Sequence, residues 1–133
     1  LQDKMLPPLD QNAAMFYERQ VVDDSYGGLA FEEEGERCSQ LFADPKNFVM
    51  IMGNHGIMVI GETVAQTFNR MYLFERASEV YIRALQTGQP LSILPHEIAA
   101  KTADEIEDYP EQDIRHLAEL KAILDEEGSN YAE

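Results

Sequence analysis

The residue of this chain best suited to chemistry is a histidine in a glycine-flanked turn. His55 stands within residues 53–56 (Gly-Asn-His-Gly), between the apolar runs 48–52 and 57–60. An imidazole at the end of a strand can project toward a cleft, and neutral imidazole is the commonest side-chain metal ligand near neutral pH. The glycines let the backbone approach closely or take positive φ. These residues leave two alternatives open: a metal ligand, or a turn histidine that bonds only to its own loop.

Two further histidines, His96 and His116, do not complete a metal site with His55. Neither stands at a spacing from His55 that defines a ligand set, and the sequence contains no His-x-His, His-Glu-x-x-His or Cys-x-x-Cys pair. Both are expected at the surface. A metal site needs three or four ligands, and the sequence supplies one candidate.

Glu75 is a carboxylate in the middle of a predicted apolar helix face. On a helical wheel of residues 63–87 it falls between Val64, Phe68 and Ile82. An unpaired buried charge is very costly, so Glu75 is expected either to have a buried partner or to face an interface. A structural ion pair or hydrogen bond is favoured over a catalytic acid.

Cys38 is the one cysteine of the chain, so it cannot form an internal disulfide. With no signal-like N-terminus, this predicts a cytoplasmic protein. Acidic residues within 32–36 precede Cys38, and neighbouring negative charge disfavours a thiolate. A small half-buried residue is therefore favoured over a nucleophile.

The charge of the chain limits its partners. The formal net charge of −15 argues against nucleic acid and against an anionic membrane surface. From residue 97 onward twelve acidic residues stand against three basic ones, which is typical of a solvated helical surface. The longest apolar run, 48–52, has the length of a strand and is too short for a membrane helix.

The elements that must position these residues follow from apolar patterning, glycine and proline. The runs on either side of His55 predict two strands that meet at a tight turn, with both faces of their sheet covered. Thr63 is the expected N-cap of the longest helix, and Gly88-Gln89-Pro90 its end. Residues 12–22 fit a short helix or a strand. The predicted α/β organisation, with few strands and about four helices, has an extended or loop region at 1–31, a helix-strand-turn-strand-helix region at 32–87 and a helical tail at 88–133.

Residues 47–86 closely resemble the class II aldolase/adducin family. The shared pattern is an apolar strand, Asn-His-Gly, a second apolar strand, Gly-x-Thr-Val at 61–64, and a long helix that carries Leu-x-Glu-Arg-Ala at 73–77. Residues 6–11 through 26–28 also look like the middle region of that family. The resemblance covers nearly all of the chain up to about residue 86, whereas the helical tail is less diagnostic.

This resemblance implies a three-layer α/β/α domain, of which the chain is the C-terminal part, and a homo-oligomer, commonly a tetramer. It also implies a divalent metal, usually zinc, held by three histidines. The third of these, the Asn-His-Gly histidine, corresponds to His55. In the family the metal assists retro-aldol cleavage, epimerisation or decarboxylation of small sugar-derived substrates, and the resemblance implies the same here.

The other family residues are missing from this sequence. The His-x-His pair and a glutamate that handles the proton are expected before residue 1, so the chain alone is predicted neither to bind metal tightly nor to catalyse. A non-catalytic, adducin-like interaction domain is the alternative. A His-x-His pair encoded just before Leu1 would favour the enzyme.

Overall fold

The computed structural model describes residues 1–25 and 31–132 and has an α/β fold, as predicted. The described strands form one sheet in the order β1-β2-β3. β1 (Gln20–Asp23) runs parallel to β2 (Val49–Met52), and β2 runs antiparallel to β3 (Gly56–Val59). The carboxyl ends of β1 and β2 therefore lie side by side, next to the start of β3.

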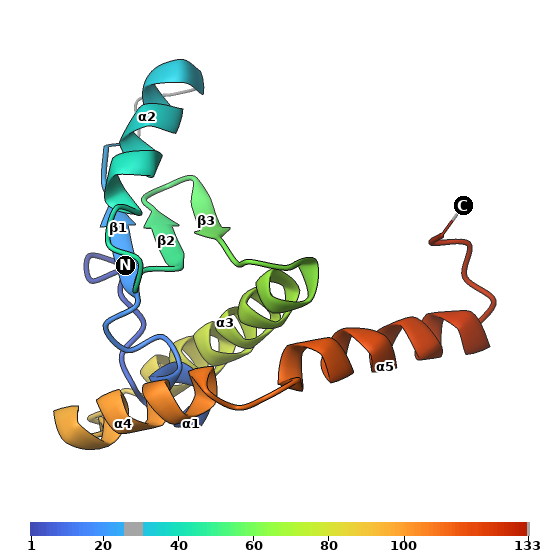
Figure 1. Ribbon diagram of the computed structural model, residues 1–133. Coiled ribbons are helices and arrows are strands. Elements are labelled where there is room, and N and C mark those ends of the chain that lie inside the picture. The colour runs from blue at the N-terminus through green and yellow to red at the C-terminus, as the bar shows by residue number, and fades with distance from the viewer. Residues whose placement is uncertain (26–30, 133) are drawn as a thin grey trace.

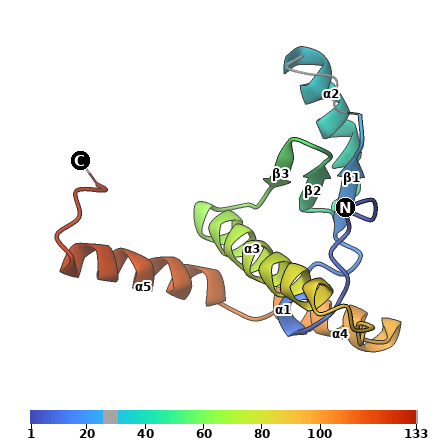
Figure 2. The same cartoon turned by 180° about the vertical axis from the view of Figure 1, so that it is seen from behind.

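The described part of the chain also contains five helices. They are α1 (Gln11–Ala14), α2 (Phe31–Leu41), α3 (Val64–Gln86), α4 (His96–Glu107) and α5 (Gln112–Glu126). Figure 1 shows α2 at one end of the sheet, with α1, α3 and α4 gathered toward the other end. The same view from behind shows that α5 extends away from the sheet as an arm (Figure 2). None of the described helices combines the length and apolar character needed to span a membrane.

The prediction of two strands that meet at a tight turn is confirmed. Val49 pairs with Val59 and Met52 with Gly56, so three residues connect β2 to β3. Within this connection the His55 N–H donates to the Met52 carbonyl at 3.1 Å. The turn thus presents His55 at the carboxyl end of β2.

The expected ends of the longest helix are also confirmed. The Thr63 side chain accepts a hydrogen bond from the Gln66 N–H at 3.1 Å, which caps the first turn of α3. After the last turn, Gly88 has a φ of +67°, a left-handed conformation that suits glycine. Local sequence signals therefore determine where α3 begins and ends.

The core forms where α1, the sheet and α3 meet. Phe16 lies edge-on to Phe48 and Phe74, with ring centroids 5.9 and 5.0 Å apart. The neighbouring β2 residues Val49 and Met50 are both fully buried. Because successive strand residues point to opposite faces, both faces of β2 are covered, whereas the residues of β3 are half-buried or exposed.

Residues 1–25 differ from the extended or loop region that was expected. They contain both α1 and β1, so the ambiguous segment 12–22 holds the end of a helix and part of a strand. The Asp10 side chain caps α1 by accepting from the Ala13 N–H at 2.8 Å. β1 forms through pairing with β2, nearly thirty residues later in the sequence. Residues 26–28, the end of the stretch that resembles the middle region of the family, lie outside the described residues.

Glu75 is exposed, so the expectation of a buried partner is wrong for the chain as described. The buried side of α3 carries Asn69, Arg70, Phe74 and Ala77 instead. The apolar stripe predicted through Val64, Phe68 and Ile82 therefore does not lie on the buried side of α3. The interface alternative for Glu75 stays a prediction.

Candidate functional site

His55 lies at the tip of the β2–β3 turn, with 37% of its side chain exposed. Asn54 precedes it in a left-handed conformation, with a φ of +59°. Gly56 follows with a φ of +153°, where any side chain would strain the backbone. Two unusual backbone conformations therefore flank the imidazole and determine where it points.

The imidazole contacts a carboxylate from α2. His55 Nδ1 lies 3.1 Å from Glu34 Oε1, and only 17% of the Glu34 side chain is exposed. Acidic residues 32–36 were considered above only for their effect on Cys38, so sequence reasoning missed this contact. The available signal was weak, because nothing in the sequence distinguishes Glu34 from its acidic neighbours.

An ion pair anchors α2 to the same end of the sheet. Arg37 Nε donates to Asp23 Oδ2 at 2.9 Å, and the Asp23 side chain is 4% exposed. Burial alone would raise the pKa of Asp23, but hydrogen bonds from the Ser25 N–H and from Arg37 outweigh it and hold the pKa below its usual value. The Gly53 N–H donates to the Asp23 carbonyl at 2.8 Å, which ties the His55 turn to β1.

Cys38 is buried beside this ion pair. Burial raises the pKa of its thiol, and the charges of Asp23 and Glu34 raise it further. A raised pKa disfavours the thiolate, which supports the structural role expected for Cys38.

The donor chemistry at the turn fits one position of a metal site. Among the described residues, no group of three or more histidine, cysteine, aspartate or glutamate side chains is placed to hold a metal ion. An imidazole with a carboxylate on one ring nitrogen is the arrangement of a metal-ligating histidine and its supporting group. His55 therefore suits a ligand whose partners come from elsewhere.

The structure separates the other two histidines from His55. His96 Nδ1 lies 3.0 Å from the Tyr17 hydroxyl at the start of α4, and its side chain is exposed as expected. His116 is half-buried, which corrects the expectation of a surface residue. Its Nδ1 lies 2.8 Å from Asn69 Oδ1, and its ring packs against Tyr72, so it joins α5 to α3.

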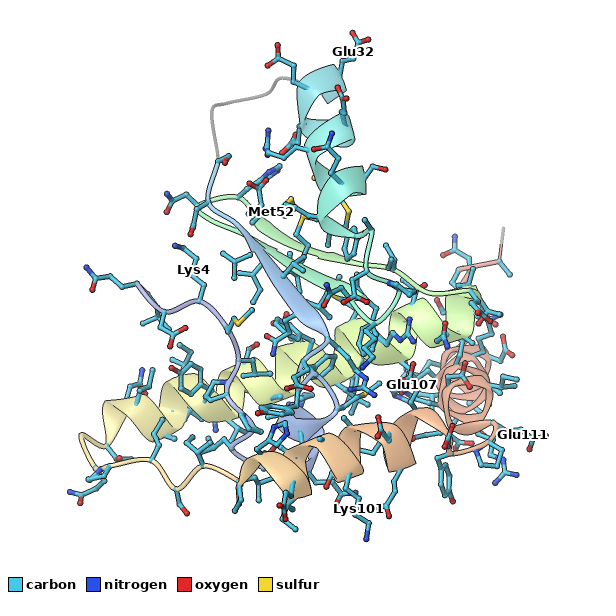
Figure 3. All side chains as sticks on the ribbon, turned by 60° about the vertical axis from the view of Figure 1, so that its left-hand side comes forward. Lys4, Glu32, Met52, Lys101, Glu107 and Glu111 are labelled. Carbon is cyan, nitrogen blue, oxygen red and sulfur yellow. The ribbon has the colours of Figure 1, made fainter. Side chains whose placement is uncertain are left out.

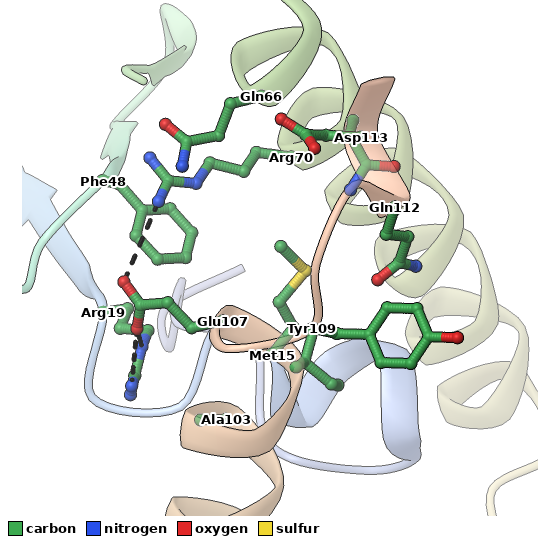
Figure 4. A pocket seen from close by; sticks show the side chains of 12 residues that line it. Met15, Arg19, Phe48, Gln66, Arg70, Ala103, Glu107, Tyr109, Gln112 and Asp113 are labelled. Atoms are coloured by element: carbon green, nitrogen blue, oxygen red, sulfur yellow. Dashed lines mark hydrogen bonds and ion pairs between the residues drawn. The ribbon is translucent and has the colours of Figure 1, made fainter. Parts of the chain in front are cut away.

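A small cavity of about 80 Å³ lies at the opposite end of the sheet (Figure 4). Arg19 donates to Asp104 at 2.7 Å and to Glu107 at 2.9 and 3.0 Å, while Arg70 lies 3.9 Å from the centre of the Phe48 ring. Figure 3 separates this end, marked by Glu107, from the other, marked by Met52 beside α2. Sequence reasoning missed this cluster, because its partners are more than 80 residues apart.

The comparison with known proteins agrees with this arrangement. Residues 1–82 match the model of the Class II Aldolase and Adducin N-terminal domain. The chain is 32% identical, over 79% of its length, to an aldolase class 2-type protein of Pseudomonas aeruginosa, and 30% identical, over 77%, to the decarboxylase NovR of Streptomyces niveus. It covers 40% and 37% of the lengths of these relatives.

A crystal structure of an aldolase II superfamily protein from Pseudomonas syringae has the same fold. The TM-score is 0.81 at 28% identity, and the match covers 96% of this chain and 51% of that chain. The chain therefore corresponds to about half of that structure. On the family match, the curated relatives and the shared fold, this chain belongs to the class II aldolase and adducin N-terminal domain family.

Proposed function

We propose that this chain carries one metal-ligand position of a metal-dependent lyase, epimerase or decarboxylase of the aldolase type. Its substrates would be small sugar-derived molecules, with or without a phosphate group. The observation that carries the proposal is His55, which the β2–β3 turn holds exposed at the carboxyl end of β2 with a carboxylate on its Nδ1. Family membership supports the same reading.

In this proposal His55 supplies one ligand, and the other ligands and the acid/base group come from a part of the domain that this chain does not contain. The bound divalent ion, which we expect to be zinc, supplies a Lewis acid for a substrate carbonyl. The chain's own contribution is to hold the imidazole at the strand end through the turn, Asp23 and α2. A cytoplasmic location stays a prediction based on the single cysteine.

The chain alone is expected to be inactive and to bind zinc weakly, because one imidazole and one neighbouring carboxylate are fewer than the three or four ligands of a protein zinc site. Titration of the 133-residue chain with zinc in competition with a chromogenic chelator tests this. We expect the chelator to retain the metal. Stoichiometric tight binding by the chain would contradict the proposal.

The ligand assignment is tested in a protein that joins this chain to the His-x-His part of the domain. His55→Ala should abolish zinc retention after gel filtration, measured by elemental analysis. His96→Ala is the matched control, since His96 is an exposed histidine bonded to Tyr17 and should leave zinc content unchanged. Full zinc content in the His55→Ala protein would refute the assignment.

A non-catalytic interaction domain is the second candidate, and the apolar surface of α3 favours it. Val64, Phe68, Tyr72 and Ile82 are all more than a third exposed, and Glu75 lies on the same stripe. The enzyme proposal also expects a homo-oligomer, so this surface serves either candidate. Sedimentation equilibrium of Val64→Asp against the unchanged chain tests self-association. If the joined protein assembles without zinc and retains no metal, the interaction domain is favoured.

A further inference from the structure

Glu34 differs from the acidic residues that surround it in α2. Glu32, Glu33 and Glu36 are exposed, whereas the Glu34 side chain is only 17% exposed. Its carboxylate lies 3.1 Å from His55 Nδ1, although the two residues are 21 positions apart. A solvated acidic surface explains the first three residues but not the fourth.

The position of Glu34 is fixed by a second contact from the same helix face. Arg37 lies three residues later, one helical turn along, and binds the buried Asp23 at the end of β1. Asp23 in turn accepts the Gly53 N–H through its carbonyl, at the start of the turn that carries His55. The face of α2 thus contacts the end of β1 through Arg37 and the β2–β3 turn through Glu34.

We propose that Glu34 is the positioning residue of His55. An ionised carboxylate can only accept hydrogen bonds, so His55 Nδ1 carries the proton in this contact. In the neutral imidazole the lone pair then belongs to Nε2, which would be the nitrogen that binds a metal. A carboxylate on the other ring nitrogen also makes the imidazole a more basic ligand. This inference rests on the proposed function, in which His55 is a ligand.

A simple surface ion pair between His55 and Glu34 is the competing explanation. Such a pair forms only with the protonated imidazole and contributes little when exposed. The two explanations differ at a pH where the imidazole is neutral. If Glu34 positions the ring, the proton stays on Nδ1 at that pH. If the contact is only an ion pair, it is lost when the imidazole is neutral, and Glu34 then favours neither tautomer.

The tautomer is measured directly by long-range proton–nitrogen NMR of the histidine-labelled chain at a pH where its imidazoles are neutral. His55 is assigned by the signal that is lost in His55→Ala. We expect the Nδ1–H tautomer in the unchanged chain and in Glu34→Gln, whose amide oxygen still accepts. Glu34→Ala should shift the population toward Nε2–H. Glu33→Ala, which removes an exposed neighbour on the same helix, should change nothing.

Zinc affinity in the joined protein gives a second measurement. Glu34→Ala should weaken zinc binding by about 10- to 100-fold, with a smaller loss in Glu34→Gln and none in Glu33→Ala. An Nε2–H tautomer in the unchanged chain, or a Glu34→Ala protein with unaltered tautomer and affinity, would overturn the inference. If His55→Ala retained its zinc, the proposed function would fail instead. The His55 mutant thus distinguishes the two failures.

Discussion

At the amino ends of β1 and β2, charged side chains are nearly enclosed, whereas at the carboxyl ends an imidazole remains exposed. Arg19 and Arg70 have side chains 9% and 10% exposed, and acidic residues of α4 and the Phe48 ring cover them. His55, at the other end, is 37% exposed and contacts the Glu34 carboxylate. Both ends use charged pairs between a helix and the sheet, but only one leaves a reactive group accessible.

This difference shows that perturbed charges do not by themselves mark a functional site. Burial would lower the pKa of Arg19, yet the hydrogen bonds that Arg19 donates to the Asp104 and Glu107 carboxylates raise it overall. Burial does lower the pKa of Arg70. These shifts belong to a closed cluster that joins α4 to the sheet, so they reflect packing and not a functional site.

The largest effect on stability is expected from the enclosed end. The double substitution Asp104→Ala/Glu107→Ala leaves the Arg19 and Arg70 guanidinium groups buried without their acidic partners. Breaking such pairs costs roughly 3–5 kcal/mol, and we expect the low end because both acids are partly exposed. Urea unfolding followed by circular dichroism measures the loss. Glu105→Ala, which removes an exposed partner of Lys101, should stay within about 0.5 kcal/mol. Equal losses in the double variant and in Glu105→Ala would show that the buried arginines do not depend on their acidic partners.

The turn at the exposed end tests backbone geometry without removing a charge. Gly56→Ala places a side chain at a φ of +153°, and the resulting strain should cost about 1–3 kcal/mol. Gly35→Ala is the matched control, because Gly35 lies within α2 and a methyl group there meets nothing within 4 Å. That substitution should stabilise the chain by roughly 0.5–1 kcal/mol. Thermal unfolding of both variants measures whether each is destabilised or stabilised. No loss of stability in Gly56→Ala would show that the turn adapts to the side chain.

Asp23 connects stability at the exposed end to pH. Its pKa is lowered in the folded chain, so its contribution is present above the unfolded pKa and is lost as the pH falls through the folded value. Asp23→Asn should therefore cost about 1–2 kcal/mol near neutral pH, since it removes the ion pair with Arg37. The difference from the unchanged chain should narrow below about pH 4. Urea unfolding across this range checks the slope, and a constant difference would contradict the assignment. Asp24→Asn, at an exposed neighbour, is the control.

The sequence was informative wherever structure depends on neighbouring residues. Thr63 and Gly88 end α3 through local hydrogen bonding and backbone freedom, and apolar runs around His55 predicted β2 and β3. The pairing that makes β1 a strand is non-local and could not be read from residues 12–22. The same is true of Glu34, whose role depends on how α2 docks against the turn.

Polar residues on a buried helix face were the other source of error. Asn69 and Arg70 point inward because His116 and the Ile60 carbonyl give them partners. A helical wheel does not include such partners, so the predicted apolar face was centred on Glu75 and not on these two residues. Family resemblance made His55 a candidate metal ligand but gave no information about Glu34.

The smallest effect on stability is expected from the residues proposed to do the chemistry. His55→Ala and Glu34→Ala each remove one side of a partly exposed contact, and surface pairs are worth up to about 1 kcal/mol in most proteins. We expect each to change the free energy of unfolding by less than about 0.5 kcal/mol, measured by urea unfolding. Such a result also guarantees that loss of zinc in His55→Ala reflects a lost ligand and not an unfolded chain. A loss as large as that of the Asp104/Glu107 double variant would mean that the turn is a structural element like the enclosed end, and would weaken the case for a metal ligand there.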